Sequence, residues 1–266
     1  MLDPFRGLRA LSHAGSHAIA LWRVVRTFRN WIPLTTNYVW RRHPLTFSHA
    51  IFRSDGYRIH LNGQEDLGNL WAIFGRQEYP LTAQDTEIID IGANIGLFTI
   101  FAAKKVKGST ITSFEPVGST FESFCENLEL SNTQKQVVPV NAGVAGSNGT
   151  RQIYLGTSSD LASMFARNAS QGVEQIETKS INSILEQRPS VSVLKMDCEG
   201  AEWEILDSAD PNLFRRVRHL YIEFHGLTPE KIKTANNHLA RLGFQQDRRQ
   251  DHGAGETAVI WASQVV

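Results

Sequence analysis

The stretch Thr86-Glu87-Ile88-Ile89-Asp90-Ile91-Gly92-Ala93-Asn94-Ile95-Gly96 guides the interpretation of the whole chain. It begins as an apolar run, which is typical of a buried parallel strand. A sharp turn from a strand into a helix needs residues without a bulky Cβ, and Gly92 and Gly96 supply them. Residues 97–103 then place apolar side chains at helical spacing. The stretch predicts a strand, a glycine turn and a helix, with a nucleotide-type ligand at the top of an α/β sheet.

The spacing of the glycines in this turn distinguishes between the classes of ligand that bind at such sites. A dinucleotide site has the pattern G-x-G-x-x-G. Here Gly92 and Gly96 form G-x-x-x-G, Asp90 precedes the first glycine by two residues, and no phosphate-binding lysine follows. A ligand without a pyrophosphate fits better, and an acid at the end of the strand suits an amine. S-adenosylmethionine, with its amino acid head, sulfonium and ribose, is the leading ligand, and a tight turn that binds nothing is the alternative.

Length and composition favour a globular α/β protein. The chain has 266 residues, of which 41% are apolar, enough for one large domain with an extension or for two small domains. No run of about 18 apolar residues occurs, and the N-terminus lacks a compact apolar signal core. We therefore expect no integral membrane segment and a cytoplasmic location. The two cysteines, Cys125 and Cys198, show neither metal-ligand spacing nor a disulfide pattern.

Charge is balanced overall but unevenly distributed along the chain. Residues 1–80 carry ten arginines and five acids, whereas the remainder carries seventeen Lys and Arg residues and twenty-two acids. The basic excess could form a patch for a membrane surface or a nucleic acid. Because apolar residues and histidines interrupt the arginines, we favour a solvated basic helix, or a helix docked on the acidic domain, and expect no nucleic-acid partner.

Strands alternate with helices after Thr86, which predicts a parallel sheet with crossover helices. The predicted strands are 87–91, 110–115, 136–140, 191–196 and 219–224, with a further strand at 151–155 and a closing antiparallel pair at 244–248 and 257–262. We interpret the polar residues 156–172 as a substrate loop or a surface excursion.

The chain before the first core strand has a different character. Amphipathic helices are expected within residues 1–45, and Asp55-Gly56 lies between two short β-rich runs, which indicates a hairpin. We therefore expect two parts: an N-terminal helical and β-hairpin extension over residues 1–78, and an α/β domain over residues 79–266.

The second and third core strands end in residues that suit a nucleoside. Glu115 follows the second strand, and Pro116 ends that strand beside it. An acid at this place accepts hydrogen bonds from ribose hydroxyls in dinucleotide sites, so we interpret Glu115 as a ribose ligand. Asn141 and Ala142 follow the third strand, where small and amide residues leave room for a flat base and offer it hydrogen bonds.

The fourth and fifth core strands end in charged residues. Because side chains alternate along a strand, Lys195, Asp197 and Glu199 are predicted to share one face. Buried charges are costly unless they are paired or used. An ion-pair network is one interpretation, and a catalytic or metal-binding cluster, which we favour, is the other. The fifth strand ends at His225, which would meet Asp197 across one pocket if the two strands are neighbours; a hydrogen-bonded structural histidine is the alternative.

Four motifs together resemble the FkbM-type methyltransferase family over about residues 79–245. They are Asp90-Ile91-Gly92-Ala93-Asn94-Ile95-Gly96, Phe114-Glu115-Pro116, Lys195-Met196-Asp197-Cys198-Glu199-Gly200-Ala201-Glu202 and Ile222-Glu223-Phe224-His225. The resemblance implies a Rossmann-like class I methyltransferase fold, with a seven-stranded, mostly parallel sheet in the order 3-2-1-4-5-7-6 and an antiparallel last strand. It also implies S-adenosylmethionine as methyl donor and a hydroxyl acceptor on a small natural product or saccharide. By position, Gly92, Ala93, Asn94 and Gly96 match the donor loop of the family, and Glu115 matches its ribose acid.

Methyl transfer to a hydroxyl requires alignment and removal of a proton. We expect His225 or Asp197 as the base, with Lys195 and Glu199 as positioning residues. A divalent ion held by Asp197 and Glu223 is an open alternative. An N-methyltransferase and a non-catalytic binding module that uses the basic N-terminal arm are competing functions, and a nicotinamide oxidoreductase is disfavoured by the glycine spacing. The oligomeric state stays open, a homo-oligomer included.

Overall fold

The computed structural model describes residues 6–41, 44–155, 172–252 and 257–265. The chain divides into two compact units. The first contains Met1–Pro80 and Glu126–Asn132, and the second contains Leu81–Cys125 and Thr133–Val266. The expected division into domains at residues 78 and 79 stays a prediction. Within the described residues, no helix combines the length and the hydropathy that a membrane crossing requires.

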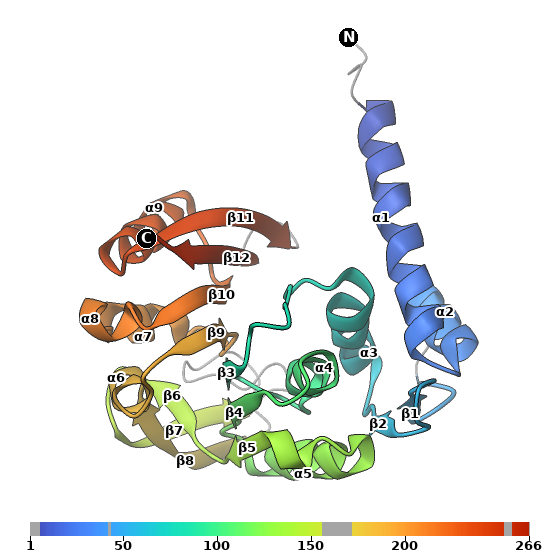
Figure 1. The fold of residues 1–266 in the computed structure, drawn as a ribbon, viewed down its shortest axis with the longest axis horizontal. Helices are drawn as coiled ribbons and strands as arrows, with labels where there is room; N and C mark the ends of the chain where they lie inside the picture. Colours follow the sequence, from blue (N-terminus) through green and yellow to red (C-terminus); the bar gives the residue numbers. More distant parts are fainter. Residues whose placement is uncertain (1–5, 42–43, 156–171, 253–256, 266) are drawn as a thin grey trace. The chain divides into compact units, whose positions relative to one another are not determined.

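The first unit consists of helices and a β-hairpin (Figure 1). Its elements are α1 (Arg6–Thr27), α2 (Trp31–Trp40), β1 (His49–Ile51), β2 (Arg58–His60), α3 (Gln64–Leu70) and a π-helical turn, η1 (Trp71–Arg76). The ring of Phe28 lies 5.2 Å from that of Phe52 and 5.3 Å from that of Phe74, measured between centroids. These aromatic contacts join α1, the hairpin region and η1 into one core, and the hairpin expected around Asp55-Gly56 is present.

The second unit contains a seven-stranded sheet in the order β11-β12-β10-β9-β3-β4-β5. Numbered along the chain, these strands have the order 3-2-1-4-5-7-6, as expected. Only β12 runs antiparallel to its neighbours, since the other pairings are parallel. The strands are β3 (Glu87–Ile91), β4 (Thr110–Phe114), β5 (Val137–Val140), β9 (Val191–Met196), β10 (Val217–His225), β11 (Phe244–His252) and β12 (Thr257–Gln264).

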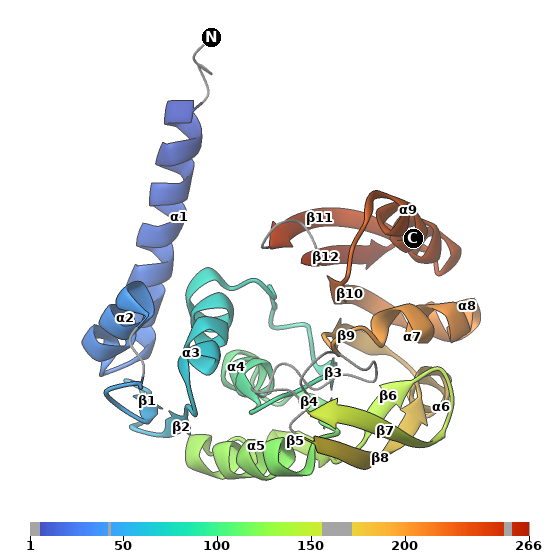
Figure 2. The same ribbon diagram turned by 180° about the vertical axis from the view of Figure 1, so that it is seen from behind.

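Helices cover both faces of this sheet, as both ribbon views show (Figure 1, Figure 2). One face carries α4 (Leu97–Lys105) and the first part of α5 (Gly118–Ser131), and the other carries α6 (Ile181–Glu186), α7 (Glu202–Ser208), α8 (Pro211–Phe214) and α9 (Pro229–Arg241). Side chains of the central strands are completely buried against the second set, for example Leu194 and Ile222. Burial on both faces explains why these strands read as apolar runs.

A smaller sheet of three strands in the order β6-β8-β7 was only partly predicted. Its strands are β6 (Gly143–Ala145), β7 (Gly149–Leu155) and β8 (Gly172–Ser180). The strand expected at 151–155 corresponds to β7, whereas β8 was missed. Most side chains of β8 are exposed or half-buried, so it lacks the apolar run that identified the other strands. Of the segment 156–172, which we interpreted as a loop, residues 156–171 lie outside the described residues, and Gly172 begins β8.

The glycine turn between β3 and α4 is shaped by its neighbours. The φ angles of Gly92 and Gly96 are +77° and +90°, in the left-handed region that favours glycine. A Cβ on Gly92 would lie 1.7 Å from the main-chain oxygen of Asp197, and one on Gly96 would lie 2.4 Å from the ring of Phe124. Both glycines are therefore required by packing within the protein.

We predict that Gly92→Ala lowers the free energy of unfolding by about 3 kcal/mol or more, because the added methyl group meets a backbone oxygen and the residue must keep a left-handed conformation. Chemical denaturation followed by circular dichroism measures this loss. The matched control is Gly68→Ala in α3, where a Cβ would meet no atom within 4 Å. The control should be neutral or stabilising by up to about 1 kcal/mol. Equal stability of the two variants would contradict the prediction.

Candidate active site

The predicted site residues lie at the carboxyl ends of five neighbouring strands, β5, β4, β3, β9 and β10, which run parallel to one another. Carboxyl ends of parallel strands share one edge of a sheet, and open α/β sheets bind ligands outside that edge. This edge carries Asp90, Gly92, Ala93, Asn94, Gly96, Glu115, Asn141, Ala142, Lys195, Asp197, Glu199 and His225.

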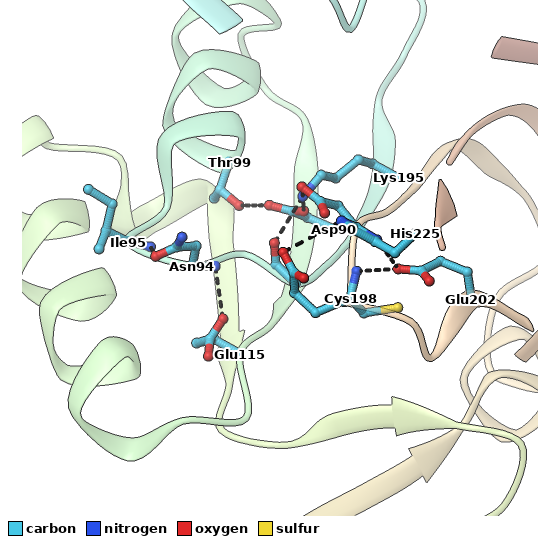
Figure 3. Close-up of polar contacts among 12 residues, drawn as sticks. Asp90, Asn94, Ile95, Thr99, Glu115, Lys195, Cys198, Glu202 and His225 are labelled. Atoms are coloured by element: carbon cyan, nitrogen blue, oxygen red, sulfur yellow. Dashed lines mark hydrogen bonds and ion pairs between the residues drawn. The ribbon is translucent and has the colours of Figure 1, made fainter. Parts of the chain in front are cut away.

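A buried ion pair joins the two central strands. Asp90 of β3 and Lys195 of β9 are direct partners in the parallel register. Lys195 Nζ lies 3.2 Å from Asp90 Oδ1 and donates a hydrogen bond of 2.9 Å to the main-chain oxygen of Gly92. The exposed fraction is 0% for Asp90 and 4% for Lys195. In this structure the ammonium partner of Asp90 is Lys195 (Figure 3), and the expected contact of Asp90 with the amine of a ligand stays a prediction.

Two hydroxyl groups complete the surroundings of Asp90. Thr99 of α4 donates a hydrogen bond of 2.7 Å to Asp90 Oδ2, and its oxygen lies 2.7 Å from that of Ser113 on β4. All three side chains are completely buried. The sequence pattern did not identify Thr99 or Ser113, because a lone hydroxyl on an apolar helix or strand carries no distinctive signal.

The charge of Lys195 is stabilised by its neighbours. Burial lowers its pKa, but the charges of Asp90 and Asp197 outweigh burial and raise this pKa well above the usual value. Lys195 is therefore an ammonium at neutral pH, which can position groups but cannot accept a proton. Its distance of 3.6 Å from Asp197 Oδ2 links the buried pair to the loop after β9.

Glu115 is held by the glycine turn. Its Oε2 accepts a hydrogen bond of 2.9 Å from the main-chain nitrogen of Asn94, and its Oε1 accepts one of 3.0 Å from that of Val117. Burial raises the pKa of Glu115 to about 7, although these two backbone hydrogen bonds oppose the shift. A carboxylate oxygen accepts more than one hydrogen bond, so both oxygens retain capacity for hydroxyl donors.

The residues expected near the base follow β5. Asn141 is exposed, and its side-chain nitrogen donates to the main-chain oxygens of Glu115 and Pro116 at 3.0 and 3.2 Å. Ala142 is 1% exposed. In this geometry Asn141 joins the ends of β4 and β5, and contact of Asn141 or Ala142 with a base stays a prediction.

The charged residues after β9 are brought together, but not by the alternation that we expected. β9 ends at Met196, so Asp197 and Glu199 lie in a loop, where Glu199 has a φ of +53°. The prediction that three charges share a strand face was therefore wrong in its backbone geometry, since alternation holds only along extended chain. Potential ligand atoms of Asp197, Glu199 and His225 nevertheless lie within 4.8 Å of one another.

His225 has an acidic partner that sequence reasoning missed. Its Nδ1 lies 3.3 Å from Oε1 of Glu202, which is completely buried at the start of α7, and its Nε2 lies 3.5 Å from Oε1 of Glu199. Burial lowers the pKa of His225, but the hydrogen bond and charge of Glu202, together with the charges of Glu199 and Asp197, raise it to about 10. In this geometry His225 holds its proton more tightly than a free imidazole, which disfavours it as a general base, and its catalytic role stays a prediction. In the sequence, Glu202 was identified only as the last acid of the Lys195–Glu202 motif, with no role assigned to it.

The sheet order, the single antiparallel strand and the polar edge define a Rossmann-like fold of the methyltransferase class. The family model described as "Methyltransferase FkbM domain" matches residues 90–250, and the chain belongs to this family. It is accordingly an enzyme of the methyltransferase type.

Similar proteins carry corresponding names. The chain is 29% identical to "Methyltransferase 1" of Beauveria bassiana, over 60% of this chain and 72% of the relative. It is 23% identical to "31-O-demethyl-FK506 methyltransferase FkbM" of Streptomyces tacrolimicus, over 60% of this chain and 74% of the relative. The solved structure of methyltransferase FkbM from Methylobacillus flagellatus has a TM-score of 0.50 at 16% identity, covering 70% of this chain but only 46% of that chain. This structural likeness shows the fold alone.

We predict that Lys195→Met destabilises the protein by about 3–5 kcal/mol, because it leaves the carboxylate of Asp90 buried without its cation. The double variant Asp90→Asn/Lys195→Met should recover part of this loss, since it removes both charges. Urea denaturation measures both effects. Lys179→Met is the control: the Lys179 side chain is 42% exposed and pairs with Glu177 at the surface, so the substitution should cost at most about 1 kcal/mol. Equal losses for the two lysines would contradict the structural role of the pair.

We predict a pH dependence of stability that arises from Glu115. Its pKa is about 7 in the folded protein against a usual value of 4.5. The folded state therefore holds the proton more tightly, so the stability that this group contributes is complete below about pH 4.5 and is lost as the pH rises to about 7, to an extent of about 3 kcal/mol. Urea denaturation at several pH values should show this decline in the wild type and a smaller decline in Glu115→Gln. The comparison uses the slope with pH, because the substitution also changes the baseline stability. Identical slopes would contradict the assignment.

Proposed function

We propose that the protein is an S-adenosylmethionine-dependent O-methyltransferase that acts on a hydroxyl of a small natural product or saccharide. The observation that carries the proposal is the carboxylate of Glu115, held by the backbone of the glycine turn at the tip of the strand next to β3. A carboxylate fixed at this place suits the two hydroxyls of a ribose.

The charges at the edge of the sheet fit the proposed donor. The carboxylates of Glu115, Asp197 and Glu199 lie at or after neighbouring strand ends, and Lys195 is engaged with Asp90. S-adenosylmethionine carries positive charge on its sulfonium and its amine, so an acidic edge attracts it. When bound, it supplies a methyl group on a sulfur that already is a good leaving group. The protein then has to bind the donor, orient the acceptor oxygen and exclude competing water.

The preference for a hydroxyl acceptor rests on two considerations. The name of the Streptomyces tacrolimicus relative describes the substrate of that enzyme as a compound that lacks a methyl group on an oxygen. In this chain, the acids Asp197 and Glu199 beside His225 provide groups that can bind or deprotonate a hydroxyl. Because the acids around His225 raise its pKa to about 10, Asp197 is the base that we favour of the two expected from the sequence.

We predict that S-adenosylmethionine binds the purified chain and that Glu115→Ala weakens this binding at least tenfold, because the ribose hydroxyls lose their acceptor. Isothermal titration calorimetry measures both affinities. Glu186→Ala is the matched control, since it removes an exposed glutamate from α6 and should leave the affinity unchanged.

Two results would overturn the proposal: no binding of the donor, or equal binding by the Glu115→Ala and wild-type proteins. The type of acceptor is tested separately with donor labelled in the methyl group and paired natural products or saccharides that carry either a hydroxyl or an amine at one position. Label transferred only to the amines would refute O-methylation while leaving the donor site intact.

A further inference from the structure

The loop after β9 and the end of β10 place three groups of metal-ligand chemistry at one point. Oxygens of Asp197 and Glu199 and a ring nitrogen of His225 lie within 4.8 Å of one another. A metal ion between such atoms would be about 2.0–2.2 Å from each, which this spacing permits with small side-chain adjustments. All three residues are half-buried, so they are reachable but partly shielded from water.

A second, independent feature lies behind His225. Glu202 is 0% exposed, and its Oε1 accepts a hydrogen bond of 2.8 Å from the main-chain nitrogen of Cys198 and lies 3.3 Å from His225 Nδ1 (Figure 3). Its other oxygen, Oε2, is buried and has no hydrogen-bond partner among the described residues. A buried carboxylate is costly unless nearby positive charge compensates it.

The pairing of Glu202 with His225 has the form found behind metal ligands. A histidine that binds a metal ion donates its other ring N–H to a carboxylate, which fixes the tautomer and the orientation of the ring. Here Nδ1 faces Glu202 at 3.3 Å and Nε2 faces Glu199 at 3.5 Å, so a cation bound at Nε2 would take the place of a proton on that nitrogen. The backbone of His225 is held as well, because Trp203 Nε1 donates to its main-chain oxygen at 3.1 Å.

Lys195 is engaged mainly with groups other than the cluster of Asp197, Glu199 and His225. Its Nζ lies closer to Asp90 and to the oxygen of Gly92, at 3.2 and 2.9 Å, than to Asp197, at 3.6 Å. It also comes from the body of β9, whereas Asp197 and Glu199 lie beyond the end of that strand. Asp197 therefore shares Lys195 with Asp90 at the longer distance, while the ligand atoms of Asp197 and Glu199 converge on His225.

We propose that Asp197, Glu199 and His225 Nε2 hold one divalent cation, with Glu202 as the positioning residue for His225, and that this cation binds the acceptor hydroxyl. Two carboxylates and one imidazole suit ions such as Mn²⁺. Three protein ligands leave coordination positions open for the oxygen of an acceptor.

The role assigned to the ion rests on the proposed function. A hydroxyl bound to a divalent cation loses its proton more easily. Because Asp197 is then a ligand of the ion, water takes its place as the acceptor of that proton. The acceptor oxygen then forms a bond to the methyl carbon of the donor, while the bond from that carbon to sulfur breaks and its electron pair stays on sulfur. The sulfonium becomes a neutral thioether, so the charges balance.

Titration of the EDTA-treated full chain with Mn²⁺, followed by electron paramagnetic resonance of the free ion, tests the site directly. We expect one Mn²⁺ per chain and an affinity that falls at least tenfold in each of Asp197→Asn, Glu199→Gln and His225→Gln. These side chains are 30%, 21% and 12% exposed, and circular dichroism checks that each variant is folded. Glu202→Gln should weaken binding about 10–100-fold, the range found for partners of metal-binding histidines.

Asp207→Asn is the matched control, because Asp207 pairs with His238 at 3.2 Å in the same unit and its side chain is 72% exposed. It should bind Mn²⁺ like the wild type. Absence of Mn²⁺ binding, binding unchanged in the three ligand variants, or binding that does not depend on His225 would each overturn the proposal.

Calorimetry with S-adenosylmethionine on the same preparations separates this inference from the proposed function. Donor binding without Mn²⁺ binding refutes the ion site alone. Mn²⁺ binding that depends on the three ligands, without donor binding, refutes the proposed function and the role of the ion in it, and leaves the site itself established.

Discussion

The buried ion pair between Asp90 and Lys195 is the interaction on which the rest of the site depends. The two residues are partners across the central strands β3 and β9, so their attraction acts directly on the register of the sheet. The ammonium also binds the main-chain oxygen of Gly92, and the carboxylate accepts a hydrogen bond from Thr99 at the start of α4. One pair therefore contacts the end of the strand, the glycine turn and the first turn of the next helix. Two opposite charges are tolerated in this interior because each is paired and hydrogen-bonded.

Because Lys195 is paired with Asp90 of β3, it affects the charges at the neighbouring strand ends. The acids beyond β9 lie on irregular backbone, where Glu199 adopts a left-handed conformation, and they converge on His225 at the end of β10. His225 in turn contacts Glu202 of α7. Carboxylates thus surround a single imidazole, and the excess of negative charge raises the pKa of His225 to about 10. An environment of this kind favours a bound cation, whether a proton, a sulfonium or a metal ion, over a neutral general base.

The sheet and the position of the site could be predicted from the sequence because both depend on local signals. Buried parallel strands are apolar runs, and the rule that ligands bind at their carboxyl ends gathers Asp90, Glu115 and His225 without knowledge of side-chain contacts. The details could not be predicted where the backbone departs from regular structure. Alternation along β9 stops at Met196, so the relation between Lys195 and Asp197 had to come from the structure. Exposed strand β8 lacks an apolar signal, and the contact of Glu202 with His225 depends on how α7 packs.

The glycine motif of this turn does not by itself show that a ligand binds there. Gly92 is needed because the main chain of Asp197 passes beside it, and Gly96 because the ring of Phe124 does, so neither glycine requires a ligand to explain it. Glu115, the acid at the end of the neighbouring strand β4, is harder to explain without a ligand. Glu115 is almost completely buried, and its pKa is raised to about 7 although two backbone N–H groups and the charge of Lys195 oppose the effect of burial. A folded protein keeps such a group at a cost in stability, which is expected where a carboxylate must be ready to bind. Glu115, rather than the glycines beside it, therefore supports the proposed nucleoside ligand.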